Sequence, residues 1–339
     1  MSTFENYITA QPRATIECGA VIDFGERATE LQLALTETVK CPLLSLGVIS
    51  ISGSDATSFI NGQFTTNCND LTTTRGQLSG WCDPKGRLLF LFTLYCDDKQ
   101  IFAVLPKSQI DRFVARLRMY VLRADVQLVN VTDSCSVFGV IGNVQLGQKE
   151  MSSLVEPWAT VHDADGTAIV QHGGGRPRFV VVGQDSTAVA RWLELSIPAA
   201  GEAAWCAMDS FAGVPRLSEQ GQGKYLPQQL NLDRLDAVSF SKGCYPGQEI
   251  IARLKYRGEV KKRLRSFVFN GEGDLVAGAR VLHRNDERLV GHILYAIRID
   301  TKEQIFSAIV ETDIDPALIS VEGTPASPVR ESDLPYTIA

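Results

Sequence analysis

The group of residues best able to do chemistry is the segment 242–249, which reads KGCYPGQE and holds Cys244. Pro246 is typical of the first turn of a helix, and apolar residues follow it at helical spacing. Cys244 is therefore predicted to lie just before a helix N-terminus, two residues from Lys242. Backbone N–H groups and a nearby ammonium favour the thiolate form of cysteine. The local sequence predicts either a reactive thiol at Cys244 or, since cysteine is often buried, an inert core residue.

The first turn of the same predicted helix carries two polar side chains, Gln248 and Glu249. A carboxylate at a helix N-terminus interacts favourably with the helix dipole, which is the simplest role for Glu249. The same carboxylate could instead hold a polar group of a ligand. The sequence alone leaves both roles open.

The basic residues of the chain are densest directly after this segment. They are Arg253, Lys255, Arg257, Lys261, Lys262, Arg263 and Arg265, opposed by Glu259. On a chain with a net charge of −6, this cluster predicts a local positive patch. Such a patch could meet a polyglutamate tail, RNA phosphates or an acidic partner protein. It could equally be a solvated helix end beside a strand edge.

Size and composition predict a folded protein of several domains. The chain has 339 residues, of which 45% are hydrophobic and 21% are charged. A single core seldom grows beyond about 250–300 residues, so two or three domains are expected. A general nucleic-acid binder is usually basic, whereas this chain has a pI near 5.4. Strong direct binding of tRNA is therefore not expected, and any RNA contact would be local.

The cysteine and histidine patterns argue against disulfides and bound metal. The eight cysteines contain no C-x-x-C pair, and the four histidines lack metal-ligand spacing, so we predict a reducing compartment and no stable metal site. The N-terminus shows no signal-peptide pattern, and the longest apolar run, Leu88–Cys96, is far shorter than the roughly 20 residues that span a bilayer. These features predict a bacterial cytoplasmic protein, although an organelle signal removed beforehand would leave the same sequence.

The elements that would position these residues form three units. Alternating apolar residues, turn residues and helical spacing predict a strand-rich α+β domain over 1–124, with a hairpin that turns at 83–86. A second α+β domain over 125–262 carries the KGCYPGQE segment and includes a strand over 236–240 directly before it. Short strands separated by Gly, Asn and Asp predict a small all-β domain over 263–339.

The segment KGCYPGQE resembles the hallmark motif of the YgfZ family, folate-binding relatives of the glycine-cleavage T-protein, an aminomethyltransferase. Three further stretches resemble the family: Tyr225-Leu226-Pro227-Gln228 followed by Asn231-Leu232, Gly53 to Gln63, and Cys82 to Arg87. The resemblance covers most of the chain. It implies an α+β, T-protein-like ring of three domains, two of them strand-rich α+β domains and the C-terminal one β-barrel-like, around a central folate pocket.

The resemblance also implies roles for individual residues. Cys244 matches the family's functional cysteine, with Lys242 beside it. The other motif residues are Gly243, Tyr245, Gly247, Gln248 and Glu249. Trp205 matches a tryptophan implicated in holding folate, and its flat indole suits a pterin ring. A second folate-side tryptophan falls at Leu46 here, which removes one aromatic contact, and Glu249 completes the expected folate-binding set.

The function implied by the resemblance centres on tetrahydrofolate or a derivative as cofactor. The expected role is assembly or repair of iron–sulfur clusters and, through iron–sulfur enzymes, tRNA modification. The expected partners are iron–sulfur proteins, such as the radical enzymes that methylthiolate tRNA. The catalytic aspartate of the T-protein would fall where this chain has Leu88-Leu89-Phe90, and leucine cannot act as a carboxylate, so glycine-cleavage aminomethyl transfer is not expected.

Two alternatives remain at this point. One is a folate-dependent one-carbon transferase, for which Asp83 is the nearest candidate acid or base. The other is a non-catalytic adaptor that docks a partner through the basic residues of 253–265. Whether the protein is an enzyme at all, and its oligomeric state, are left open by the sequence.

Overall fold

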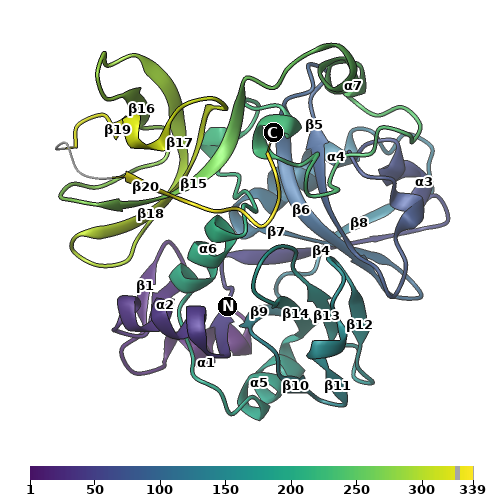
Figure 1. Ribbon diagram of the computed structural model, residues 1–339. Helices are drawn as coiled ribbons and strands as arrows, with labels where there is room; N and C mark the ends of the chain where they lie inside the picture. Colours follow the sequence, from purple (N-terminus) through teal and green to yellow (C-terminus); the bar gives the residue numbers. More distant parts are fainter. Residues whose placement is uncertain (325–328, 339) are drawn as a thin grey trace.

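Three antiparallel sheets of five or six strands form the framework of this computed structural model, which describes residues 1–324 and 329–338 (Figure 1). The first sheet has the order β5-β6-β7-β4-β8. Its strands are β4 (Leu46–Ser52), β5 (Gln77–Cys82), β6 (Leu88–Cys96), β7 (Ile101–Pro106) and β8 (Gln127–Asn130). Two helices flank it, α3 (Ala56–Asn61) and α4 (Ile110–Arg118).

The predicted hairpin of the first sheet is confirmed. Strand β5 pairs with β6, and the turn closes where the Gly86 N–H donates to the Asp83 carbonyl at 2.9 Å. Gly86 has a φ of 73°, a backbone conformation that strains any residue with a Cβ. The helical spacing after β7 is confirmed as well, because α4 buries Ile110, Phe113 and Leu117 against the sheet.

The second sheet has the order β12-β13-β14-β9-β3. Its strands are β3 (Val39–Pro42), β9 (Cys135–Ile141), β12 (Thr160–His162), β13 (Ala168–Gln171) and β14 (Arg178–Gln184). The helices of this region are α1 (Thr3–Thr9), α2 (Arg27–Thr36), α5 (Asp185–Glu194) and α6 (Glu202–Phe211). Four short strands complete it, β1 (Thr15–Glu17), β2 (Ala20–Asp23), β10 (Gln145–Leu146) and β11 (Lys149–Glu150).

The strands of these two sheets do not follow the chain strictly. Strand β3 lies in the second sheet although it precedes the first sheet in sequence, and β8 lies in the first sheet although it follows residue 125. Sheet membership therefore crosses the boundary expected at 124–125. The division into 1–124, 125–262 and 263–339 stays a prediction.

The third sheet curls on itself at one end of the molecule and has the order β19-β16-β17-β18-β15-β20 (Figure 1). Its strands are β15 (Lys262–Asn270), β16 (Arg280–His283), β17 (Leu289–Arg298), β18 (Glu303–Glu311), β19 (Ile319–Val321) and β20 (Val329–Ser332). Apolar residues such as Phe267, Val281 and Phe306 fill the inside of the curl. This confirms the expected β-barrel-like C-terminal unit.

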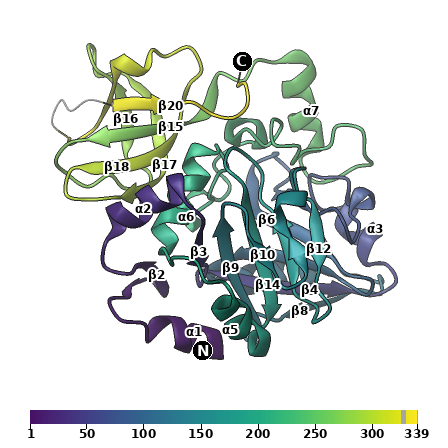
Figure 2. The ribbon, with the colours of Figure 1, turned by 60° about the horizontal axis from the view of Figure 1, so that its bottom comes forward.

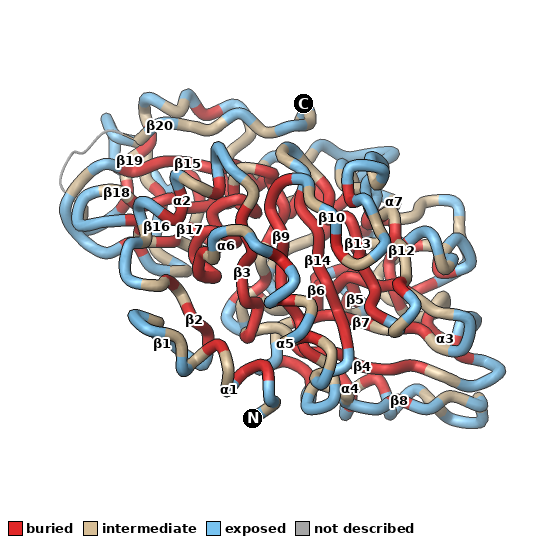
Figure 3. The backbone as a smooth tube through the Cα atoms, turned by 90° about the horizontal axis from the view of Figure 1, so that it is seen from below, coloured by how far each residue is buried: buried red, intermediate tan, exposed pale blue. Residues whose placement is uncertain are grey.

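One buried apolar cluster joins all three sheets. The same buried cluster contains Leu91 of β6, Val180 of β14 and Ile309 of β18. Helix α6 lies where the three units meet, and the buried parts of β6, β9 and β14 converge beside it (Figures 2 and 3). A site placed here would be held by all three units at once.

The strand predicted over 236–240 is wrong. This stretch is irregular, and its backbone bonds to distant segments instead of forming a sheet ladder. The Ser239 N–H donates to the Thr65 carbonyl at 2.8 Å, and the Thr65 hydroxyl donates to the Ala237 carbonyl at 2.7 Å. Helix α7 (Gln248–Arg257) follows, so Pro246 lies two residues before the helix rather than in its first turn.

Candidate functional site

A cavity of about 630 Å³ lies between the three units, a volume typical of small-molecule sites. The first sheet contributes β4, β6 and β7 to its wall, and the second contributes β14. Helix α6 and the segment 214–219 form the facing wall, and Tyr295 of β17 reaches it from the third sheet. Most of the lining is apolar, with a few charged groups at defined places.

Trp205 and Leu46, expected to contact folate, both line this cavity. The indole of Trp205 is only 2% exposed, so little of the ring faces the open space. It packs so closely on Gly139 of β9 that a Cβ there would lie 2.4 Å from the ring. The Arg178 guanidinium lies 5.4 Å from the ring centre. Trp205 is therefore a rigid part of the wall, and Leu46 adds an aliphatic contact.

A buried charged cluster lies behind Trp205, and sequence reasoning missed it. Asp209 forms ion pairs with Arg178, which is fully buried, and with Arg216 at 3.3 Å. Burial by itself would raise the pKa of Asp209, but Arg178, His172 and Arg216 hold that pKa well below its usual range. The residues come from four separate stretches of chain and share no motif spacing, so the sequence carried no signal for them.

His172 is the residue of this cluster best suited to contact a ligand. Its Nε2 lies 3.2 Å from the Asp209 carboxylate, and burial lowers the pKa of the imidazole, so the ring is neutral at physiological pH. Both ring nitrogens are buried and make no hydrogen bond of good geometry among the described residues, and Nδ1 has no polar group paired with it at all. A buried polar atom without a partner is costly, and a ligand in the cavity that His172 lines would supply one.

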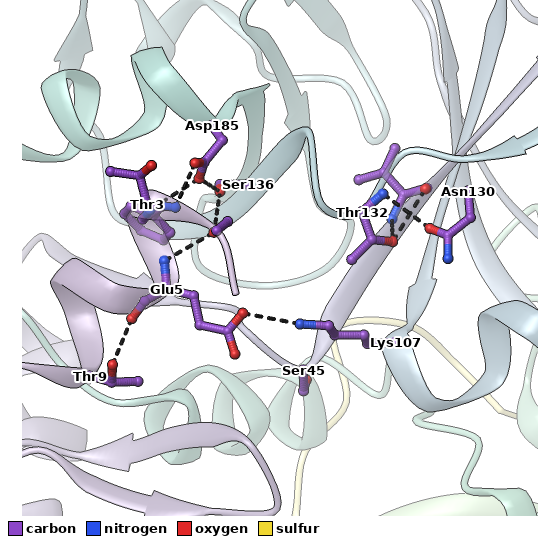
Figure 4. A network of polar contacts seen from close by, with 12 residues as sticks. Thr3, Glu5, Thr9, Ser45, Lys107, Asn130, Thr132, Ser136 and Asp185 are labelled. Carbon is purple, nitrogen blue, oxygen red and sulfur yellow. Dashed lines mark hydrogen bonds and ion pairs between the residues drawn. The ribbon is translucent and has the colours of Figure 1, made fainter.

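The N-terminal helix α1 contributes Glu5 to the cavity wall. The Glu5 carboxylate pairs with the Lys107 ammonium at 3.2 Å, and both residues belong to the cavity wall (Figure 4). The Asp185 carboxylate fixes the start of α1 by accepting the backbone N–H of Thr3 at 2.6 Å and of Phe4 at 3.0 Å. Burial opposes its ionisation, but these N–H groups and the Ser136 hydroxyl lower the pKa of Asp185 to about 2.

Replacing Asp185 with alanine should therefore release α1. The N-cap of α1 itself is Ser2, and Asp185 accepts two further N–H groups of its first turn. We expect a loss of about 1 kcal/mol, the usual value of a side chain that accepts such N–H groups, and faster amide exchange over residues 3–9 by hydrogen–deuterium exchange. Because the pKa is lowered in the folded state, this contribution is complete above about pH 4 and is lost as the pH falls towards 2. Ser186→Ala, at the exposed next position, is the control. Equal exchange in both variants would contradict this role of Asp185.

The KGCYPGQE segment lies outside the cavity wall. Cys244 is exposed and lies four residues before the first residue of α7. Gly247 has a φ of 81°, and a Cβ there would lie 2.4 Å from the Cα of Gly86, so the segment packs directly on the β5–β6 turn. The thiol is thus held at the surface by a rigid backbone.

Lys242 ties this segment to the first unit. Its ammonium donates to the carbonyl groups of Asn61, of Phe64 at 2.7 Å and of Thr66 at 2.8 Å. Burial lowers the pKa of Lys242 to about 8. The ammonium also lies 5.0 Å from the ring centre of Tyr245, which is buried beside it. These contacts assign the Lys242 ammonium to positioning of the loop that carries Cys244.

The remaining motif residues have different surroundings. Gln248 and Glu249 do fall in the first turn of α7, as predicted. The Gln248 amide donates to the Lys242 carbonyl at 3.4 Å, whereas Glu249 is exposed and absent from the cavity wall. Gly243 is exposed, with open space around it. The structure therefore brings Trp205 and Leu46 together but leaves Glu249 apart from them.

The predicted basic cluster is smaller than its sequence suggests. Arg263 and Arg265 are buried in β15, where strand alternation and pairing enclose both side chains. Arg263 forms two hydrogen bonds to the Asp233 carboxylate at 2.9 and 3.0 Å, and Arg265 pairs with Glu331. The five cations from Arg253 to Lys262 remain at or near the surface.

Within the described residues, no helix is long and apolar enough to cross a membrane. The same residues contain no group of three or more His, Cys, Asp or Glu side chains that could hold a metal ion.

Comparison with solved structures defines the class of fold. The glycine cleavage system aminomethyltransferase T of Bartonella henselae aligns with a TM-score of 0.76, covering 98% of this chain and 96% of that one, at 13% identity. The chain therefore has the aminomethyltransferase T fold, as expected.

Comparison with curated sequences defines the family. The tRNA-modifying protein YgfZ of Vibrio vulnificus (strain CMCP6) is 35% identical over 235 residues, which cover 69% of this chain and 71% of that protein. The protein of the same name from Colwellia psychrerythraea is 28% identical over 313 residues, or 90% and 95% of the two chains. No family model matches the sequence. The chain belongs to the YgfZ family.

Proposed function

We propose that this protein binds tetrahydrofolate or a derivative in the central cavity and supports the assembly or repair of iron–sulfur clusters, with Cys244 as its functional thiol. Through iron–sulfur enzymes, such as those that methylthiolate tRNA, it would affect tRNA modification. The observation that carries the folate proposal is the cavity itself, which combines an apolar wall with the unpartnered Nδ1 of buried His172. The names of the YgfZ relatives support the link to tRNA modification.

The cavity residues fit the parts of a folate. Trp205 and Leu46 offer an apolar wall for a pterin ring, and His172 offers a hydrogen-bond acceptor for one of its N–H groups. Lys107 lines the cavity with a side-chain exposure of 42%, so its ammonium could pair with the glutamate carboxylates of a folate. A bound tetrahydrofolate would supply a carrier of one-carbon units.

The surface position of Cys244 fits a role towards a partner protein better than one towards the bound folate. The thiol is exposed and absent from the cavity wall. An iron–sulfur cluster usually takes four thiolate ligands, so one cysteine would hold a cluster only together with a partner's ligands. The cluster is therefore cargo in this proposal, handled transiently in the bacterial cytoplasm, where thiols stay reduced.

A one-carbon transferase is less well supported. Asp83, the candidate acid or base, accepts the backbone N–H groups of Lys85 at 2.8 Å and Arg87 at 2.9 Å in the β5–β6 turn and is absent from the cavity wall. Asp209 does line the cavity, but its carboxylate oxygens pair with Arg178 and Arg216, which keep the group ionised and unavailable as an acid. Turnover of a one-carbon folate by the purified protein would favour the transferase.

The first test is tetrahydrofolate binding by calorimetry. Trp205→Phe should lower the affinity about fivefold, because the smaller ring loses wall contact worth about 1 kcal/mol and loosens the packing on Gly139. Cys244→Ala should bind as wild type does, since the thiol lies outside the wall. If the wild type binds no tetrahydrofolate, the folate proposal is wrong and the adaptor alternative gains support.

A further inference from the structure

The exposed cations around α7 form a surface that the proposed function does not use. It consists of four exposed residues and the partly exposed first residue of β15, and it is named here the α7 basic surface: Arg253, Lys255, Arg257, Lys261 and Lys262. None of these five side chains lies within 4.0 Å of a carboxylate among the described residues. The neighbouring Arg263 and Arg265, by contrast, are buried and paired. Unpaired cations at the surface are available to an external anion.

Three more unpaired cations lie beside the N-terminal end of α7. The β5–β6 turn packs on Gly247 and α7, which brings Lys85 and Arg87 to this side. The Arg87 guanidinium donates to the Lys224 carbonyl at 2.7 Å and so holds Lys224 nearby. All three side chains are exposed and, within the described chain, have no ion pair. These eight cations outnumber the exposed carboxylates of Glu249 and Glu259 in and after α7, on a protein whose net charge is −6.

Aromatic rings lie within the same surface. Tyr256 is 67% exposed, more than any other Phe, Trp or Tyr among the described residues, and it lies between Lys255 and Arg257 in sequence. The half-buried ring of Phe240 lies 6.4 Å from it, and the Lys255 ammonium lies 3.7 Å from the Phe240 ring centre. The Lys255 ammonium also lies 5.7 Å from the Tyr256 ring centre, yet most of the surface of this tyrosine stays exposed to solvent. It is the kind of side chain on which a nucleic-acid base stacks.

We propose that the α7 basic surface binds single-stranded RNA, with its cations on the phosphates and Tyr256 stacked on a base. An acidic polypeptide would satisfy the cations but gives no reason for the exposed ring between them. Phosphate contacts and one stacked base give binding that is local and strongly dependent on salt. The affinity should be modest, because the protein as a whole is acidic and repels RNA outside this surface. This inference goes beyond the proposed function and does not depend on folate binding.

The test is fluorescence anisotropy with a labelled single-stranded RNA of about ten nucleotides and mixed sequence, at several salt concentrations. We expect the double variant Arg253→Glu with Arg257→Glu to lower the affinity at least about tenfold and to flatten the salt dependence. The control is Lys99→Glu with Arg123→Glu, which makes the same change in net charge at exposed positions of the first unit. This control should bind nearly as wild type does.

Tyr256→Ala separates RNA from an acidic partner. Loss of one stacked base should lower the affinity about fivefold or more while leaving the salt dependence unchanged. The proposal is overturned if wild type and the Arg253/Arg257 variant bind the RNA equally. It is also overturned if polyglutamate of equal charge competes fully and Tyr256→Ala has no effect, because the surface would then be a site for acidic proteins. Unchanged thermal melting of each variant shows that the fold is intact.

Discussion

Replacing Asp209 with alanine should destabilise the folded protein by about 3–5 kcal/mol, the usual cost of removing one partner from a buried ion pair. Arg178 is fully buried, and within the described residues its guanidinium hydrogen-bonds to the Asp209 carboxylate and to the Gly173 carbonyl at 2.9 Å. Without the carboxylate, the guanidinium charge stays in the interior uncompensated, because arginine does not lose its proton. Arg216 and His172 would lose a partner at the same time.

Guanidinium denaturation of the full chain measures this effect, with Glu219→Ala as the control. Glu219 belongs to the same cavity wall but is exposed and lies in no ion pair among the described residues, so its loss should cost less than about 0.5 kcal/mol. The pKa of Asp209 is lowered in the folded state, so its contribution is complete above about pH 4 and is lost as the pH falls. If the free energy of unfolding of Asp209→Ala fell with decreasing pH as steeply as that of the wild type, this role of Asp209 would be contradicted.

The Asp209 cluster also shows what the sequence could not reveal. The hairpin turn at 83–86 and helix α4 follow from local signals, a glycine at positive φ and apolar residues at helical spacing, and both were predicted correctly. The cluster joins His172, Arg178, Asp209 and Arg216 across two strand ends, a helix and a loop. No local rule links residues that only the tertiary fold brings together.

The errors have the same origin. The stretch 236–240 has strand-like residues, but its backbone N–H groups donate to the carbonyl groups of Thr65 and Leu232. It therefore forms no hydrogen-bond ladder with a neighbouring strand. The sequence around Arg263 and Arg265 predicts surface charges, but both side chains are buried in ion pairs with Asp233 and Glu331. Trp205 and Leu46 were placed by family resemblance, and nothing in their own sequence context indicated that they would share a cavity. Local physical signals in the sequence therefore predict individual helices and turns, whereas the cavity and its lining are defined only by the tertiary structure.

Cys244→Ser should remove most of the proposed function while leaving the fold intact. The thiol is exposed and makes no hydrogen bond among those of the described residues, so the free energy of unfolding should change by less than about 0.5 kcal/mol. In a bacterial strain lacking its own YgfZ protein, we expect methylthiolated tRNA nucleosides, measured by mass spectrometry, to fall at least about tenfold compared with wild-type complementation, because serine is a far poorer ligand for iron and sulfur species than a thiolate.

Cys18→Ser is the matched control, since Cys18 is the other cysteine that the structure describes as exposed. It lies at the cavity wall, in the turn between β1 and β2, away from the KGCYPGQE segment. Full activity of Cys18→Ser beside an inactive but stable Cys244→Ser would assign the function to one thiol rather than to exposed thiols in general. If Cys244→Ser retained activity while Arg253→Glu with Arg257→Glu lost it, the α7 basic surface would be the functional element. The three carbonyl groups bound by Lys242 would then stabilise the loop around Cys244 without serving a reaction of the thiol.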